Sequence, residues 1–100
     1  MFTPQKTKEF EQRIKQGAHH IYKGEPLEGP LKCEVHCYFV KPKSAKRDYP
    51  CVKPDADNLL KAVLDGLNGV CFKDDAQFID KYVTKRYAEE ESIKVRITAI

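Results

Sequence analysis

The stretch LKCEVHCYFV at residues 31–40 decides the fold, because apolar and polar side chains alternate along it. Leu31 and every second residue as far as Phe39 point one way, and Lys32, Glu34, His36 and Tyr38 point the other. A period of two is typical of a β-strand with one buried face. Residues 31–40 are therefore predicted to form a strand whose apolar side lies on the core.

Two helices are predicted, one before this strand in the sequence and one after it. Residues 4–18 have apolar side chains at helical spacing, and Thr3 is a suitable N-cap before Pro4 at the first helical position. Residues 57–68 carry a wider apolar stripe that ends at Asn68-Gly69, a favourable helix stop.

Two further strands are predicted near the C-terminus. Residues 78–87 and 92–100 are both rich in strand-forming residues, and the acidic turn 89–91 is expected to join them in a hairpin. Residues 19–30 and 41–54 contain the glycines and prolines of connections. The order α-β-α-β-β predicts a single α+β domain spanning residues 1–100, with its helices packed on a mixed or antiparallel sheet.

Composition excludes several classes of protein. The chain has 100 residues, of which 41% are hydrophobic, so it is not disordered or fibrous. No apolar run approaches the roughly 20 residues of a membrane helix. The first ten residues lack the apolar region of a signal peptide, so a cytoplasmic protein is expected.

Charge is unevenly distributed along the chain, whose formal net charge is +3. Residues 1–54 hold 11 Lys and Arg against 6 Asp and Glu, which gives +5, while residues 55–100 hold 7 against 9, which gives −2. The basic part ends in Lys41, Lys43, Lys46, Arg47 and Lys53. A basic loop of this kind suits a polyanionic substrate, although a solvated loop explains its charge as well.

The cysteines and histidines do not indicate a metal site. Cys33, Cys37, Cys51 and Cys71 are separated by 3, 13 and 19 residues, which matches no common zinc template. Three of them, Cys33, Cys37 and Cys71, are interpreted as core residues, and disulfides are not expected without a secretory signal. His19-His20 is expected at the end of the first helix, where positive charge is favourable.

The segment KPDADNLLKAVLDGLNGVCFKDDAQ at residues 53–77 holds the candidate chemistry. If the chain is extended there, Asp55 and Asp57 point the same way, roughly 6–7 Å apart. Lys61 follows Asp57 by one helical turn. A second acidic pair, Asp74-Asp75, lies on a loop that can fold back toward the first. Carboxylates gathered in this way are typical of a Mg²⁺ or Mn²⁺ site.

Each aspartate also has a purely structural explanation. Asp57 can cap the helix, Asp55 can start the turn, and Asp74-Asp75 can be a polar loop. A calcium-binding EF-hand loop is excluded, because the sequence has no D-x-D-x-D-G pattern with a glutamate at position twelve. The residues alone therefore indicate an acidic metal site beside a basic loop, and leave the capping explanation open.

Three blocks of this segment resemble a known family. They are Asp55-Ala56-Asp57-Asn58-Leu59-Leu60-Lys61-Ala62, then Asp65-Gly66-Leu67, then Asp74-Asp75-Ala76-Gln77. In this order and spacing they resemble the RusA family of Holliday-junction resolvases. The opening helix and the basic loop are also similar, so the resemblance covers nearly the whole chain.

The resemblance implies a homodimeric, Mg²⁺-dependent endonuclease, with Mn²⁺ as a substitute, that makes paired symmetric nicks in four-way DNA junctions during recombination and repair. It implies that Asp55, Asp57 and Asp75 bind the metal and that Lys61 is a catalytic lysine. Asn58 would hold the start of the helix, Asp65 would either support the site or simply be exposed, and the role of the neighbouring Asp74 stays open. Lys85 would contact a phosphate. From charge and position, Lys41, Lys43, Lys46, Arg47 and Lys53 are the expected DNA-backbone contacts.

Two other functions compete with this one. The same site would serve a less selective nuclease acting on flaps or forks. A non-catalytic junction-binding module is the other alternative. Family members commonly begin with a further strand before the helix that opens this chain, a departure that bears on edge protection, dimer geometry and some DNA contacts.

Overall fold

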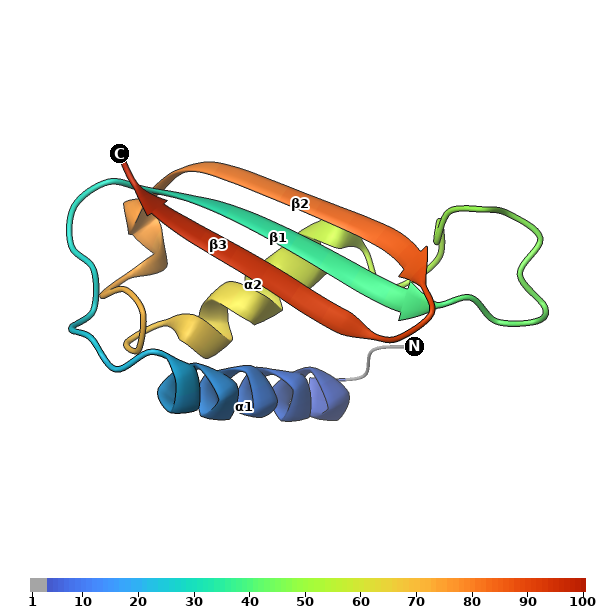
Figure 1. Cartoon of the computed structure of the whole chain (residues 1–100), viewed down its shortest axis with the longest axis horizontal. Coiled ribbons are helices and arrows are strands. Elements are labelled where there is room, and N and C mark those ends of the chain that lie inside the picture. The colour runs from blue at the N-terminus through green and yellow to red at the C-terminus, as the bar shows by residue number, and fades with distance from the viewer. Residues whose placement is uncertain (1–3) are drawn as a thin grey trace.

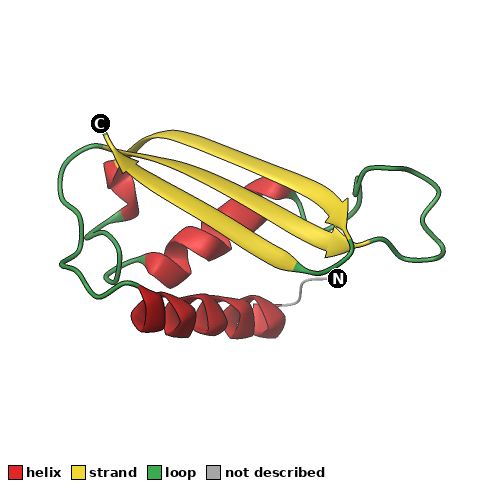
Figure 2. Ribbon diagram, viewed as in Figure 1, coloured by secondary structure: helices red, strands yellow, loops and turns green. Residues whose placement is uncertain are grey.

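The computed structural model describes residues 4–100, with side chains from Lys8 onward, as helices packed on one face of a three-stranded sheet (Figures 1 and 2). The predicted α+β class and the α-β-α-β-β order are confirmed. In chain order the elements are α1 (Pro4–Ile21), β1 (Leu31–Val40), α2 (Ala56–Leu67), the 3-10 turn η1 (Asp75–Gln77), β2 (Phe78–Ala88) and β3 (Ser92–Ala99).

The hairpin predicted for the last two strands is wrong. The strand order is β2-β1-β3, so β2 and β3 lie on opposite sides of β1. β2 runs parallel to β1, and β3 runs antiparallel to it. Because β1 carries the most apolar strand face in the chain, the central position buries it best. The short connection 89–91 then passes the end of β1 (Figure 1).

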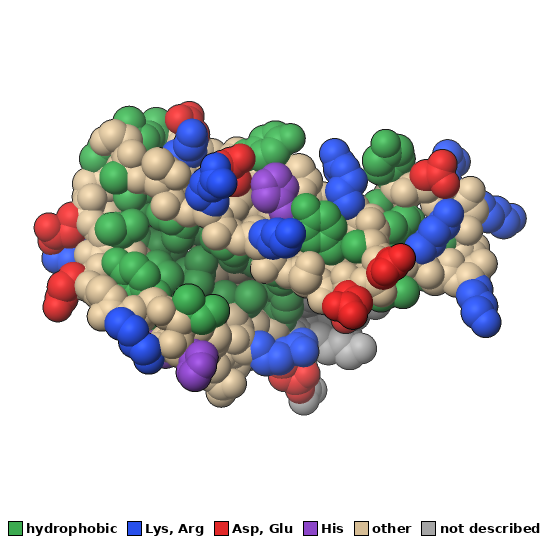
Figure 3. Space-filling model, viewed as in Figure 1, with side chains coloured by type: hydrophobic (Ala, Val, Ile, Leu, Met, Phe, Trp, Pro, Cys, Tyr) green, Lys and Arg blue, Asp and Glu red, His purple; other side chains and the backbone are tan. Residues whose placement is uncertain are grey.

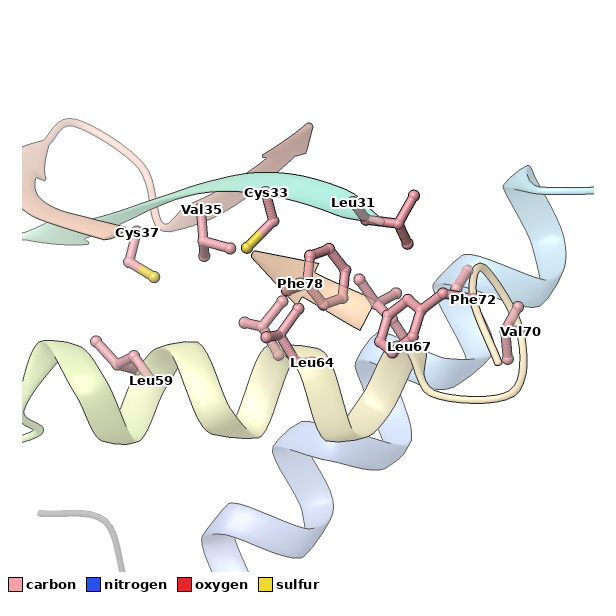
Figure 4. Packing of buried hydrophobic residues seen from close by; sticks show 12 residues of the cluster. Leu31, Cys33, Val35, Cys37, Leu59, Leu64, Leu67, Val70, Phe72 and Phe78 are labelled. Atoms are coloured by element: carbon pink, nitrogen blue, oxygen red, sulfur yellow. The ribbon is translucent and has the colours of Figure 1, made fainter. Parts of the chain in front are cut away.

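The core lies between β1 and α2. Leu31, Cys33, Val35 and Cys37 are fully buried, which confirms the alternation predicted for this strand. In Figure 4, Leu59 and Leu64 of α2 point up toward these residues. The rings of Phe72 and Phe78 meet edge to face, 4.8 Å between centroids, at the end of the sheet where β2 begins.

The helices pack on each other at Gly66. A Cβ atom there would lie 2.8 Å from the Ile14 side chain and 2.9 Å from the Glu11 carbonyl oxygen, so only glycine allows this approach of α1 to α2. α1 extends three residues beyond the predicted end, and His19 and His20 lie in its last turn as expected. The N-cap predicted at Thr3 lies outside the described residues.

The buried thiols behave as core residues. Burial raises the pKa of Cys37 to about 11 and also raises the pKa of Cys33 and of the half-buried Cys71. Cys51 is exposed on the loop before α2. Among the described residues, no helix is both long and apolar enough to cross a membrane.

Candidate nucleic-acid interface and metal site

The basic loop, residues 41–54, projects beyond the end of the sheet (Figure 2). A backbone hydrogen bond of 3.0 Å from Ala45 to Pro42 forms a turn within it, and Lys41 pairs with Asp48 at 3.5 Å. The five predicted DNA contacts on this loop are all exposed: Lys41, Lys43, Lys46, Arg47 and Lys53. Figure 3 shows Lys and Arg side chains gathered on this projecting end, which offers a polyanion several phosphate contacts.

Lys85 holds the base of the loop to the sheet. Its ammonium donates hydrogen bonds of 2.7 Å to the Val52 carbonyl and 2.8 Å to the Pro54 carbonyl. Both acceptors come from the residues directly before Asp55. The phosphate contact predicted for Lys85 is therefore not what the structure displays, because the ammonium is engaged within the chain.

Asp55 and Asp57 stand at the start of α2 without acting as caps. Asp55 occupies the N-cap position, but its side chain makes no capping hydrogen bond and instead accepts one of 3.0 Å from Lys53. Asp57 lies in the first helical turn, exposed, and its carboxylate has no partner among the described residues. The extended spacing predicted for the two is wrong, since the helix begins at Ala56. Asp55 therefore starts the helical turn, as its structural explanation expected, but neither carboxylate makes a capping hydrogen bond among the described residues.

Lys61 follows one turn along the same helix. Its side chain is 76% exposed and its ammonium lies 3.9 Å from the Asp65 carboxylate. An exposed pair of this kind contributes only about 0.3–0.5 kcal/mol, so the lysine is restrained lightly and can turn toward a phosphate. Asn58 is exposed, and its side chain makes no hydrogen bond in the part of the chain that the structure describes.

Asp74 and Gln77 build a capping box around η1. Asp74 accepts a hydrogen bond of 3.1 Å from the Ala76 amide, while Gln77 accepts from the amides of Lys73 and Asp74, each at 2.8 Å. The Ala76 bond, together with Asp75, holds the pKa of the Asp74 carboxyl below its usual value. For Asp74 the structural explanation is the one that the structure displays.

Gln77 also ties this loop to the segment before β1. Its amide nitrogen donates to the carbonyls of Leu27 and Gly29, each at 3.0 Å. Lys73 adds an ion pair to Glu28, which lowers the pKa of that carboxyl. The motif contains Gln77, but no role was predicted for this residue from the sequence. Its spacing of three residues from Asp74 is that of a capping box and could have indicated the role.

The structure does not bring Asp75 to Asp55 and Asp57. Asp75 lies just before Phe78, where β2 begins, whereas Asp55 lies beside Lys85, seven residues further along β2. That length of strand spans roughly 23 Å. Among the described residues, no group of three or more His, Cys, Asp or Glu side chains is placed to hold a metal ion. The prediction that the Asp74-Asp75 loop folds back toward Asp55 and Asp57 is therefore wrong within one chain, because the length of α2 separates the two acidic pairs (Figure 1).

The donors at the start of α2 nevertheless fit a particular kind of ion. Mg²⁺ is commonly held by one or two carboxylates, and waters and substrate phosphates complete its octahedron. Asp55 and Asp57 offer two hard oxygen donors beside a loop that can carry the phosphates. The chemistry of these side chains therefore fits a divalent cation whose remaining ligands are waters and phosphate oxygens.

The chain matches a family model along almost its whole length. The model is that of endodeoxyribonuclease RusA, and the match covers residues 1–98. A relative, the uncharacterized protein YqaN of Bacillus subtilis (strain 168), is 33% identical over 112 aligned residues, which cover 100% of this chain and 79% of the relative. Together with the carboxylates of α2 and the basic loop, these matches place the chain in the RusA family of endodeoxyribonucleases.

Proposed function

We propose that this protein is a Mg²⁺-dependent Holliday-junction resolvase, a homodimer that makes paired nicks in opposed strands of four-way DNA junctions in the cytoplasm. The observation that carries the proposal is the pair Asp55 and Asp57 beside an exposed basic loop, because neither carboxylate is used in a capping hydrogen bond among the described residues. Membership of the RusA family supports the same reaction class.

Each part of the site has a chemical task in this proposal. Asp55 and Asp57 hold the ion, which supplies Lewis-acid polarisation of the phosphodiester; Mn²⁺ substitutes for it. Lys61 places a cation where negative charge develops in the transition state. The exposed cations of the basic loop neutralise DNA phosphates, so five contacts give a slope near −4 or −5 of log affinity against log salt.

A homodimer accounts for two features at once. Opposed strands of a junction are cut symmetrically only if two sites are related by a two-fold axis. Asp75 lies far from Asp55 and Asp57 of its own chain, so it reaches an ion on that pair only when a second copy brings it there. We therefore place Asp75 on the ion bound by the partner chain.

A nicking assay tests the reaction. A labelled four-way junction and a linear duplex of the same sequence are incubated with Mg²⁺ or with EDTA. We expect paired, metal-dependent nicks in the junction alone, and none with Asp57→Asn, which still binds the junction. Asp48→Asn removes the same charge from an exposed site on the loop and is expected to keep nicking. Wild-type cleavage by Asp57→Asn would refute the site.

Mixed dimers test the placement of Asp75. Asp57→Asn and Asp75→Asn chains are each expected to be inactive alone. When they are mixed, one site of each heterodimer combines an intact Asp57 with an intact Asp75, so single nicks are expected to return. Continued inactivity of the mixture would contradict the shared site and leave Asp75 without this role.

The same experiments separate the competing functions. Equal cutting of flaps and junctions would indicate a less selective structure-specific nuclease. Junction binding without any metal-dependent nick would indicate a non-catalytic binding module.

A further inference from the structure

One face of the sheet is not covered by either helix. The register places alternate residues of all three strands on this surface, which we call the open face. α2 packs on the opposite side, against the buried residues of β1, and α1 packs on α2. Figure 3 looks onto it and shows a histidine flanked by Lys and Arg side chains. The residues of the open face that matter here are His36, Tyr38, Tyr82, Arg86, Lys94 and Arg96.

Aromatic rings on this face are held in place by their neighbours. His36 bonds to the Thr84 hydroxyl at 2.8 Å, and its ring meets that of Tyr82 edge to face with centroids 6.0 Å apart. Tyr82 itself is 56% exposed. The Lys94 ammonium stands 5.7 Å from the centre of the Tyr38 ring. The surface therefore offers an oriented, accessible ring beside fixed cations.

The charge of the open face is positive. Lys32, Arg86, Lys94 and Arg96 stand against Glu34 and Asp80, four cations against two anions. Arg86 also lies over the ring of Tyr49, 5.5 Å from its centroid, which joins the face to the basic loop. A polyanion bound by the loop can thus continue onto the sheet.

We propose that the open face binds unpaired DNA nucleotides next to a branch point, with a base stacked on Tyr82 and phosphates on Arg86 and Lys94. Rings that stack on bases, interleaved with cations on an uncovered sheet, are the features that single-strand binding requires. A second copy of the chain is the other candidate occupant, but charged side chains are depleted at the centre of protein interfaces. The inference rests on the proposed function for its choice of DNA substrate.

Binding to a short fluorescent oligothymidine, measured by anisotropy in EDTA, tests this surface without any cleavage. Tyr82→Ser is expected to weaken binding about tenfold, because stacking of one base is lost. Tyr82→Phe keeps the ring and is expected to bind like the wild type. Lys94→Gln is expected to lower the salt slope by about 0.7. Lys81→Gln, on the other face of the same sheet, is the matched control and is expected to leave the slope unchanged.

Three outcomes would overturn the inference: no binding of the oligonucleotide by the wild type, equal binding by Tyr82→Ser, or a dimer that Tyr82→Ser converts to a monomer in sedimentation. The last would identify the face as an interface between copies. If the binding pattern holds but junctions are never nicked, the proposed function fails and this surface stands. If junctions are nicked and Tyr82→Ser binds the oligonucleotide normally, the proposed function stands and the inference about the open face fails.

Discussion

Replacing Lys85 with methionine removes the ammonium that holds the Val52 and Pro54 carbonyls but keeps an apolar side chain as long as the aliphatic stem of lysine. Hydrogen bonds to a charged group contribute about 1.5–3 kcal/mol each when buried. The bonds of Lys85 are partly solvated, so we discount the pair to about 1–2 kcal/mol in all. Losing that free energy lowers the ratio of molecules whose loop base is held against β2 to molecules whose loop base is released by about 5- to 30-fold. We expect kcat for junction nicking to fall by up to the same factor while KM changes little, because Asp55 and Asp57 lose their fixed position.

Hydrogen exchange of the loop amides gives the second readout. Exchange around Val52 and Asp55 is expected to accelerate in Lys85→Met and to stay normal in Lys81→Met, which changes an exposed lysine of the same strand. Lys85→Arg restores a donor and should recover part of kcat. The reasoning is refuted if Lys85→Met nicks normally. It is also refuted if the variant loses DNA affinity and salt slope while the loop amides stay protected, since Lys85 would then be a phosphate contact.

Three substitutions and one thiol-labelling experiment have definite expected outcomes. Gly66→Ala drives a methyl group into Ile14, and we expect chemical denaturation to show a loss of about 1–3 kcal/mol of stability. Gln77→Ala leaves four backbone groups without their partner, and thermal unfolding should show a loss of about 2 kcal/mol. Cys37 has a raised pKa, so the stability it contributes is complete below pH 9 and is lost as the pH rises through about 11; alkaline denaturation of wild type against Cys37→Ala measures it. At neutral pH, Cys51 should react with a thiol reagent before Cys37 does.

The sequence predicts the helices and strands well, but it predicts poorly which distant segments pack or pair with each other. The alternation around Val35 and the apolar stripe of α2 both reflect burial against a core, so pattern alone located these elements. The hairpin failed because closeness along the chain favoured pairing of β2 with β3, whereas burial of β1 decided the sheet order.

The candidate site divides in the same way. The motif located Asp55 and Asp57, and the structure then showed that neither carboxylate makes a capping hydrogen bond among the described residues. The motif could not show that the length of α2 keeps Asp75 away from them, because spacing along a chain does not give direction in space. The task of Lys85 was equally hidden, since it depends on which carbonyls the loop presents to β2.

The sheet order has a consequence for how the chain folds. Val35 pairs with Val83, 48 positions later, and with Val95, 60 positions later, so both strand pairings of this sheet join segments that lie far apart in sequence. Folding that depends on distant contacts is slow, because the entropy of closing long loops is lost before the contacts form. On the ribosome, β1 has no partner until the last quarter of the chain is made. The lysine that fixes the loop before Asp55 is itself in that quarter, so a nascent chain acquires its ordered carboxylates only near the end of synthesis.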